Sequence, residues 1–270
     1  MSESVAFAGV DVGSLGSKSV IFEDGKIIGS SILRTGLKSE ESGLDALDAA
    51  LEDAGRRRGD LKYIVGTGYG RISAPYADKT VTEITCHARG AHFLHPKTRT
   101  IIDMGGQDCK AIRLDEEGNV TDFAMNDKCA AGTGRFLEVM ANVMKVGIED
   151  LGELSLNATE VLPVSSTCTV FAESETISLI ARGEKSENII VGIHHAIANR
   201  IHGLFSRVGI ENDVFFSGGV AKNVGMRKAL EDVMGIRLAQ PEGDPQLAGA
   251  IGAAILAQEA WSKKKILAVV

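Results

Sequence analysis

The chain has little of what marks several common protein classes. Its 270 residues carry 29 Lys and Arg against 36 Asp and Glu, a net charge of −7, so there is no basic excess to bind nucleic acid. The longest run of small and apolar residues, 247–257, is too short to span a bilayer. The N-terminus carries acidic residues and no apolar core of a signal peptide. We therefore expect a soluble, cytoplasmic protein without a membrane or nucleic-acid partner.

Cysteine is also scarce. The four cysteines are Cys86, Cys109, Cys129 and Cys168, and no two of them form the C-x-x-C pair that most strongly signals a metal site. Disulfide bonds are not expected in a cytoplasmic protein. Cys86 falls in an expected helix and Cys109 in an expected strand, where a small buried residue is the simplest interpretation.

A glycine-rich pattern occurs twice, each time after a short apolar run. The first copy is residues 10–18, Val-Asp-Val-Gly-Ser-Leu-Gly-Ser-Lys, and the second is residues 101–108, Ile-Ile-Asp-Met-Gly-Gly-Gln-Asp. Each predicts a buried strand that ends in Asp-x-Gly and turns into a second strand. A glycine-centred hairpin follows each copy at nearly the same distance, at residues 24–25 and 117–118. The repetition indicates a duplicated domain with a nucleotide held between the halves.

The residue types suit phosphate chemistry. Consecutive backbone N–H groups in a tight turn can bind one anion, and glycine allows its close approach. Asp11 and Asp103 would repel a phosphate, so we expect them to hold Mg²⁺ or to orient the attacking water. Ordinary Asp-Gly turns are the alternative, but two copies in matching contexts favour phosphate binding. The first loop offers Gly13, Ser14, Leu15, Gly16, Ser17 and Lys18.

The second loop and a later turn complete the expected nucleotide site. Gly105, Gly106 and Gln107 form the second loop, and Gln107 can orient a water without being a strong base. An exposed glutamine without a role is the alternative. Residues 213–221 predict a strand, a Gly-Gly turn and a helix start. The bare backbone of such a turn can lie against a base and ribose. Its expected contacts are Gly218, Gly219 and Val220.

Apolar periodicity predicts alternating strands and helices. The expected strands are residues 5–12, 19–22, 26–33, 63–65, 100–104, 110–114 and 120–125. The expected helices include residues 44–54, 86–94, 136–144 and 190–208, with Arg56, Arg57 and Arg58 at the end of the first. His95-Pro96 predicts a boundary. The expected domains are residues 1–96, together with a C-terminal helix at 245–262, and residues 97–244.

Cys129 and Cys168 each lie in a turn of polar and small residues that opens a helix. A helix N-terminus stabilises a thiolate, and its N–H groups can bond to the sulfides of an iron–sulfur cluster. Two cysteines cannot complete a four-thiolate site, but a symmetric dimer would supply the other two. From spacing alone, small residues in helix-start turns remain the simpler interpretation.

Two resemblances bear on these patterns. The Asp loops and the Gly-Gly turn, in this order, resemble the actin, Hsp70 and sugar-kinase superfamily over nearly the whole chain. This implies an α/β, duplicated actin-like ATPase (ribonuclease-H-like) fold with two subdomains around a nucleotide cleft. Residues 126–138, Asn-Asp-Lys-Cys-Ala-Ala-Gly-Thr-Gly-Arg-Phe-Leu-Glu, with residues 102–108 before them, are similar to the ATP-dependent activators (component A) of 2-hydroxyacyl-CoA dehydratases. Those activators belong to the BadF/BadG/BcrA/BcrD ATPase family.

The second resemblance reverses the interpretation of the two cysteines. It implies an oxygen-sensitive homodimer with one [4Fe-4S] cluster, bound by Cys129 and Cys168 of both subunits, and with ATP or ADP and Mg²⁺. Ferredoxin or flavodoxin would supply an electron, which ATP drives to a partner iron–sulfur dehydratase. The turn of Gly132, Thr133 and Gly134 would link cluster and nucleotide. Related subunits serve benzoyl-CoA reductases and double-cubane-cluster reductases. The alternative of another class is a small-molecule kinase, which would not need the two cysteines.

Overall fold

The computed structural model describes residues 5–126 and 129–267, which form two compact units. The first unit comprises the described residues of Met1–Lys97, Asp115–Val120 and Pro241–Val270, and the second comprises those of Thr98–Leu114 and Thr121–Gln240.

The first unit is built on a five-stranded sheet in the order β3-β2-β1-β4-β5. Its strands are β1 (Ala6–Val12), β2 (Gly16–Glu23), β3 (Lys26–Arg34), β4 (Leu61–Thr67) and β5 (Lys79–Thr80). β1 runs antiparallel to β2 and parallel to β4. Every residue of β1 is buried, as expected of a strand that is covered on both faces.

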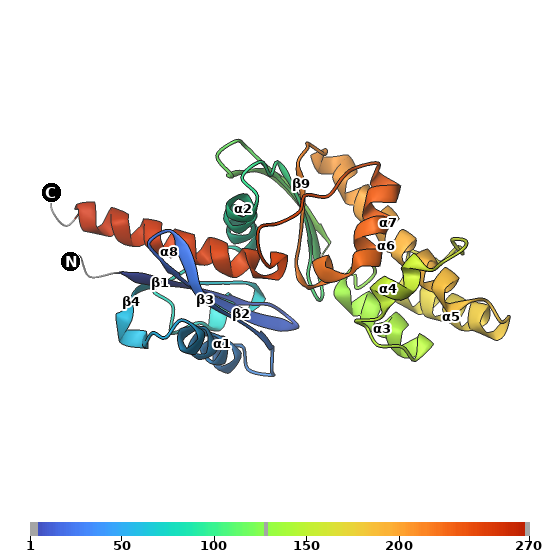
Figure 1. Ribbon diagram of the computed structural model, residues 1–270, viewed down its shortest axis with the longest axis horizontal. Coiled ribbons are helices and arrows are strands. Elements are labelled where there is room, and N and C mark those ends of the chain that lie inside the picture. The colour runs from blue at the N-terminus through green and yellow to red at the C-terminus, as the bar shows by residue number, and fades with distance from the viewer. Residues whose placement is uncertain (1–4, 127–128, 268–270) are drawn as a thin grey trace. The chain divides into compact units, whose positions relative to one another are not determined.

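Helices cover both faces of this sheet (Figure 1). Alternate β1 residues, such as Val10, pack with Leu47 of α1 (Ser39–Asp53) on one face. Phe7 packs on the other face with residues of α2 (Glu83–Leu94) and α8 (Ala248–Leu267). The short helices of this unit are η1 (Arg58–Asp60), η2 (Tyr69–Ser73) and η4 (Pro245–Leu247). α8 crosses β1 at Gly9, where a methyl group would lie 2.0 Å from the Ala250 carbonyl oxygen.

The second unit repeats the arrangement around a four-stranded sheet in the order β8-β7-β6-β9. Its strands are β6 (Thr100–Met104), β7 (Cys109–Leu114), β8 (Val120–Asn126) and β9 (Val214–Ser217). β6 is antiparallel to β7 and parallel to β9, as β1 is to β2 and β4. The first four strands of each unit therefore share one topology, which is the duplication that the repeated loops predict.

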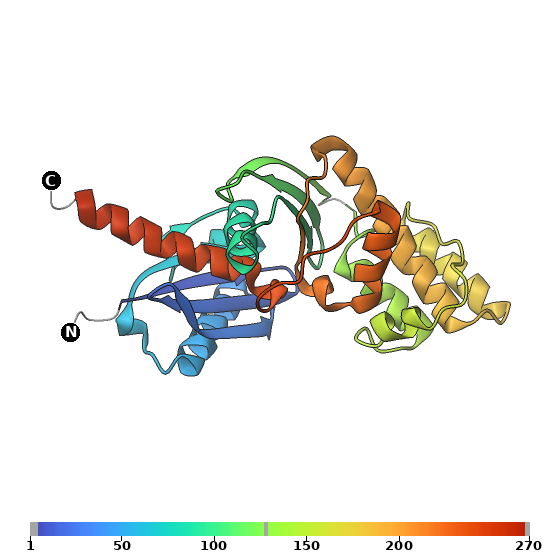
Figure 2. The same cartoon turned by 45° about the horizontal axis from the view of Figure 1, so that its top comes forward.

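The helices of the second unit gather on one side of its sheet (Figure 2). They are α3 (Gly134–Met144), α4 (Leu151–Leu156), α5 (Thr169–Ala181), α6 (Ser186–Val208), η3 (Gly219–Lys222) and α7 (Val224–Met234). Phe136 of α3, Ile197 of α6 and Phe216 of β9 are buried in a single apolar core. This core fixes the ends of β6 and β9, which carry the candidate site.

Most expected elements are confirmed to within a few residues, but the prediction for the arginine cluster is wrong. α1 ends at Asp53 and has no basic residue in its last turn. Gly55, with φ of +61°, follows the helix end, so the arginines lie beyond it. Arg56 instead makes two hydrogen bonds to the Glu23 carboxylate. Across the described residues, no helix is both long and apolar enough to cross a membrane.

Candidate functional site

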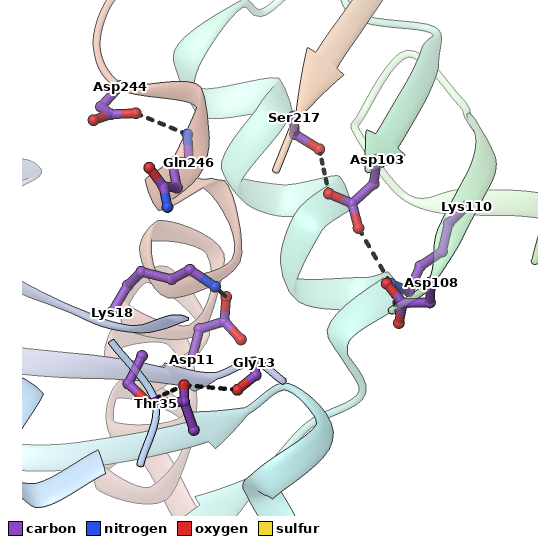
Figure 3. Close-up of polar contacts among 11 residues, drawn as sticks. Asp11, Gly13, Lys18, Thr35, Asp103, Asp108, Lys110, Ser217, Asp244 and Gln246 are labelled. Carbon is purple, nitrogen blue, oxygen red and sulfur yellow. Dashed lines mark hydrogen bonds and ion pairs between the residues drawn. The ribbon is translucent and has the colours of Figure 1, made fainter. Parts of the chain in front are cut away.

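Asp11 lies near the end of β1, with only 2% of its surface exposed. The strand register places it opposite Lys18, and the Lys18 Nζ lies 3.0 Å from Asp11 Oδ2 (Figure 3). The turn between them is closed by a hydrogen bond from Gly13 N to the Gly16 carbonyl. Ser17 is buried and its hydroxyl bonds to that of Thr35, which itself donates to the Gly13 carbonyl. Ser14 and Leu15 are half-buried within the turn.

Asp103 occupies the same place at the end of β6 (Figure 3). It lies opposite Lys110, whose Nζ is 3.2 Å from Asp103 Oδ2 and 2.9 Å from Asp108 Oδ2. The turn is again closed by one backbone bond, from Gly105 N to the Asp108 carbonyl. Gly106 is half-buried and Gln107 is exposed at the tip of the turn. The sequence reasoning missed Lys110, although it stands seven residues after its aspartate, as Lys18 does.

The acid–lysine pair of the second unit is strongly coupled. Burial by itself lowers the pKa of Lys110, but the charges of Asp103 and Asp108 and their hydrogen bonds outweigh burial and raise it. Lys110 is therefore held protonated among carboxylates. The hydroxyl of Ser217, at the end of β9, donates to Asp103 Oδ1 at 2.9 Å.

A glycine from a neighbouring strand abuts each aspartate. Gly218, which follows β9, has φ of +89°, and a methyl group on it would lie 3.0 Å from Asp103 Oδ1. Gly68, which follows β4, has φ of +83°, and a methyl group would lie 2.4 Å from Asp11 Oδ1. A short 3₁₀ helix follows both glycines. Only one of these turns, the Gly-Gly turn, was predicted from sequence. Its counterpart lacks the double glycine, so only the fold reveals the match.

A further group near Asp11 comes from α2. A methyl group at Gly249 would lie 2.7 Å from Asp11 Oδ2 and 2.9 Å from His87 Nε2, so the two side chains flank one point. His87 is 6% exposed. A lone histidine in a helix gave no signal in the sequence.

The second phosphate loop is joined to the turn that follows Cys129. Gly134 N donates to the Gly105 carbonyl at 2.9 Å, and Arg135 N donates to the Gly106 carbonyl at 2.8 Å. Gly132 and Thr133 are buried beside this joint. These bonds connect the predicted nucleotide loop to the predicted cysteine segment through the main chain. Asp127 and Lys128, which belong to the motif at residues 126–138, lie outside the described residues.

Side chains also shape the Cys129 turn. Asn126 Nδ2 donates to the carbonyls of Cys129 and Ala131, each at 3.1 Å. Thr133 Oγ1 donates to the Ala130 carbonyl at 2.7 Å. The turn is thus fixed from both ends, and the Cys129 side chain remains half-buried.

Cys168 stands at the N-cap position of α5 with extended backbone, φ of −150° and ψ of 138°. It is half-buried and, like Cys129, is in no disulfide. The first N–H groups of α5 have no acceptor within the helix and face the same end. Val170, Phe171 and Ile177 of this helix are 65%, 63% and 53% exposed, so an apolar surface lies next to Cys168.

The other two cysteines are buried, as expected from sequence. Burial raises the pKa of the Cys86 thiol to about 12 and also raises that of Cys109. Cys129 and Cys168 therefore fit cluster ligands better than these two. Among the described residues, no three His, Cys, Asp or Glu side chains come together as a metal site. A Cys₄ site would accordingly need cysteines from a second chain.

A cavity of about 410 Å³ lies in the second unit beside the Gly-Gly turn. Its lining comes from the segment between α3 and α4: Lys145, Val146, Gly147, Asp150, Glu153 and Leu154. Gly152 of this segment approaches the end of η3, the short helix after the Gly-Gly turn, since a methyl group on it would lie 3.0 Å from Asn223 Oδ1. Val220 of η3 is buried. The volume suits a small ligand, and no sequence motif marked the cavity.

Comparison with known proteins accords with this geometry. The model of the BadF/BadG/BcrA/BcrD ATPase family matches residues 8–257. The chain belongs to this family. The activator of lactoyl-CoA dehydratase from Anaerotignum propionicum is 51% identical over 258 residues, 95% of this chain and 98% of that protein. The resemblance predicted from the cysteine motif is therefore confirmed.

Solved structures agree. Component A of the Acidaminococcus fermentans (R)-2-hydroxyglutaryl-CoA dehydratase superposes with a TM-score of 0.92 at 45% identity, covering 96% of this chain and all of that one. The activator of the Clostridium difficile 2-hydroxyisocaproyl-CoA dehydratase with bound ADPNP also gives 0.92, at 43% identity, covering 97% of each chain. A ROK hexokinase from Thermus thermophilus, at 15% identity, covers 95% of this chain and 99% of that one with a TM-score of 0.55, and it shares the fold alone. The predicted α/β actin-like ATPase fold is confirmed.

Proposed function

We propose that the protein is a homodimeric iron–sulfur ATPase that couples ATP binding and hydrolysis to low-potential, one-electron reduction of a partner 2-hydroxyacyl-CoA dehydratase-type enzyme. The observation that carries this proposal is the joint between the second phosphate loop and the Cys129 turn. Gly105 and Gly106 accept hydrogen bonds from Gly134 and Arg135. Because these bonds are short and backbone-to-backbone, a shift of the loop on hydrolysis would reach the cysteine segment directly.

The nucleotide chemistry rests on the two acids. Asp11 and Asp103 would hold Mg²⁺ through its waters or orient the water that attacks the γ-phosphorus and releases ADP and phosphate. Lys18 and Lys110 pair with the two acids, and each would turn toward phosphate oxygens when Mg²⁺ takes the acid. Exposed Gln107 would orient the water. The actin-like subdomains assigned to these loops are residues 1–96 with 245–262, and residues 97–244.

The nucleoside end of ATP would lie in the second unit. The turn at Gly218, Gly219 and Val220 offers backbone, and the cavity beside it offers apolar and charged side chains. Asp150 and Glu153 on its wall are suited to accept hydrogen bonds from ribose hydroxyls.

Cys129 and Cys168 would hold the cluster together with their copies in a second subunit. When bound, a [4Fe-4S] cluster supplies a one-electron carrier. Both thiols are accessible, each segment opens a helix, and the apolar residues of α5 beside Cys168 suit burial against a second copy. The two cysteines favour this function over a small-molecule kinase, which would not use them.

We infer the electron donor and the acceptor from the family resemblance. The electron donor would be ferredoxin or flavodoxin, and the acceptor an iron–sulfur dehydratase in the cytoplasm. An ATPase subunit of a benzoyl-CoA reductase or of a double-cubane-cluster reductase is the second candidate. It would use the same cysteines and loops with a different acceptor.

The test is the iron content of the anaerobically purified protein. We expect a dimer with about four irons, the content of one Cys₄ cubane cluster. Cys129→Ser or Cys168→Ser should lose the iron, whereas the matched controls Cys86→Ser and Cys109→Ser should keep it. Full iron in the Cys129→Ser protein, measured by a colorimetric iron assay, would contradict the assignment.

A further inference from the structure

One arginine side chain contacts both cysteine segments, here residues 129–134 and 165–168. Arg200 projects from α6, and its Nη1 donates to the Ser166 carbonyl at 3.1 Å, two residues before Cys168. A methyl group at Gly132 would lie 3.0 Å from Arg200 Cδ and 3.6 Å from its Nε. The same side chain therefore lies against the turn three residues after Cys129. Gly132 has a φ of +89°, and because it lacks a side chain it allows this close approach.

Within the part of the chain that the structure describes, the charge of Arg200 is poorly balanced. Among the described residues it forms no ion pair, and its Nε is buried without a hydrogen-bond partner. Arg200 is half-buried, and a cation that is partly withdrawn from water is costly unless an anion compensates its charge. The Arg200 charge also acts to lower the pKa of Cys109, against the larger effect of burial, so the guanidinium lies within electrostatic reach of the strand that follows the second phosphate loop. The segments that it touches both carry thiols, which become anionic when they bind iron.

We propose that Arg200 is a positioning residue, which fixes the two cysteine segments relative to each other and presents its guanidinium charge to the anionic group that their thiolates bind. The second half of this statement rests on the proposed function. The first half concerns the polypeptide alone, so each half can be tested separately.

The first measurement uses metal-free protein and hydrogen exchange. Thr133, Gly134, Ser165 and Thr167 report on the segments, because their amides all donate within or next to them. Because Arg200→Met removes the charge-assisted hydrogen bond to Ser166, we expect these amides to exchange about tenfold faster or more in that variant. Arg200→Lys, which keeps a donor at the tip, should fall between this variant and the natural protein.

The control is Arg207→Met, an exposed arginine on the same helix, which should leave all four amides unchanged. Wild-type exchange in a folded Arg200→Met protein would overturn the positioning role. If that variant does not fold, Arg200→Lys decides, because unchanged exchange together with an unchanged cluster spectrum would overturn the proposal.

The second measurement is the reduction potential of the cluster, which depends on the charge of Arg200. In the iron-loaded dimer we expect Arg200→Met to make the reduction potential more negative, because the cluster gains negative charge on reduction and a nearby cation favours that. Arg200→Lys should restore much of the shift, which a purely structural role would not do. Identical potentials in all three proteins would overturn the charge role. Absence of iron from the natural protein would instead overturn the proposed function and leave the exchange result standing.

Discussion

In the first unit Asp11 pairs with one lysine that is 13% exposed, whereas in the second Asp103 shares a lysine that is 3% exposed with another aspartate. Both aspartates stand at the same strand position, and both are abutted by a positive-φ glycine. The difference lies in what surrounds them. The second loop is bonded to the Cys129 turn by two main-chain hydrogen bonds within its own unit. Duplication thus gave two similar acid sites, and the surroundings of the second connect it to the cysteine segment.

The largest expected effect tests whether the two acids are equivalent in hydrolysis. Asp11→Asn and Asp103→Asn should each lower Mg²⁺-dependent ATPase activity by about 100-fold or more, since each removes a charge that holds the metal or orients water. Iron content should not change. Asp232→Asn, in an exposed acid–lysine pair, is the control and should retain full activity. Normal ATPase rates in both variants would show that neither loop serves the nucleotide.

The Asp103→Asn variant also tests whether the second loop is linked to the cysteine turn. In the natural protein we expect a chelator to remove iron faster with ATP than with ADP, because coupling of about 1–3 kcal/mol would change the accessible population several-fold or more. Asp103→Asn should abolish this difference. Equal chelation rates with both nucleotides, when binding is measured separately, would break the proposed link between phosphate loop and cysteine turn.

The two units should also differ in what their lysines contribute to stability. Lys110→Met should lower the free energy of unfolding by about 3–5 kcal/mol, because it breaks the buried ion pair between Lys110 and Asp103. Lys18→Met should cost less, since Lys18 is more exposed and serves a single acid. Urea unfolding without nucleotide measures both. Lys228→Met, from the exposed pair with Asp232, should change little. A larger loss for Lys18→Met would reverse the comparison between the units.

The last expected effect is a pH dependence in the second unit. Burial lowers the pKa of His194 to about 3, with the charge of His195 acting the same way. The unfolded chain takes up this proton near pH 6.5, so it binds more protons than the folded chain between about pH 6.5 and 3. Stability from this residue is complete above that window and falls as pH falls through it, by up to about 1.4 kcal/mol per pH unit.

His194→Gln removes this titration while it can still accept a hydrogen bond from Asn223 Nδ2, which lies 3.4 Å from His194 Nε2. We expect a flatter decline of the unfolding free energy between pH 6.5 and 4 in this variant. His195→Asn, at the less buried neighbouring position, should keep the natural slope. Equal slopes for all three proteins would mean that burial does not lower the pKa of His194 in the folded state.

The local features of this protein could be predicted from the order of its residues. The apolar runs and Asp-x-Gly turns predicted both β-hairpins, and the helical periodicity predicted α3 and α6, because these depend on neighbouring residues in the chain. The cysteine motif identified the family. The arginines after α1 were misplaced because a helix end depends on one glycine, Gly55, and their partners lie elsewhere in the fold.

How these features work together depends on contacts that form when the chain folds. Gly68 reaches Asp11 across 57 residues of sequence, and Arg200 reaches Ser166 across 34, so no local pattern records either contact. The joint between Gly105 and Gly134 likewise depends on how β6 and α3 pack around a common core. Spacing along the chain specifies turns and faces, whereas contacts between distant segments arise only when the apolar core brings them together.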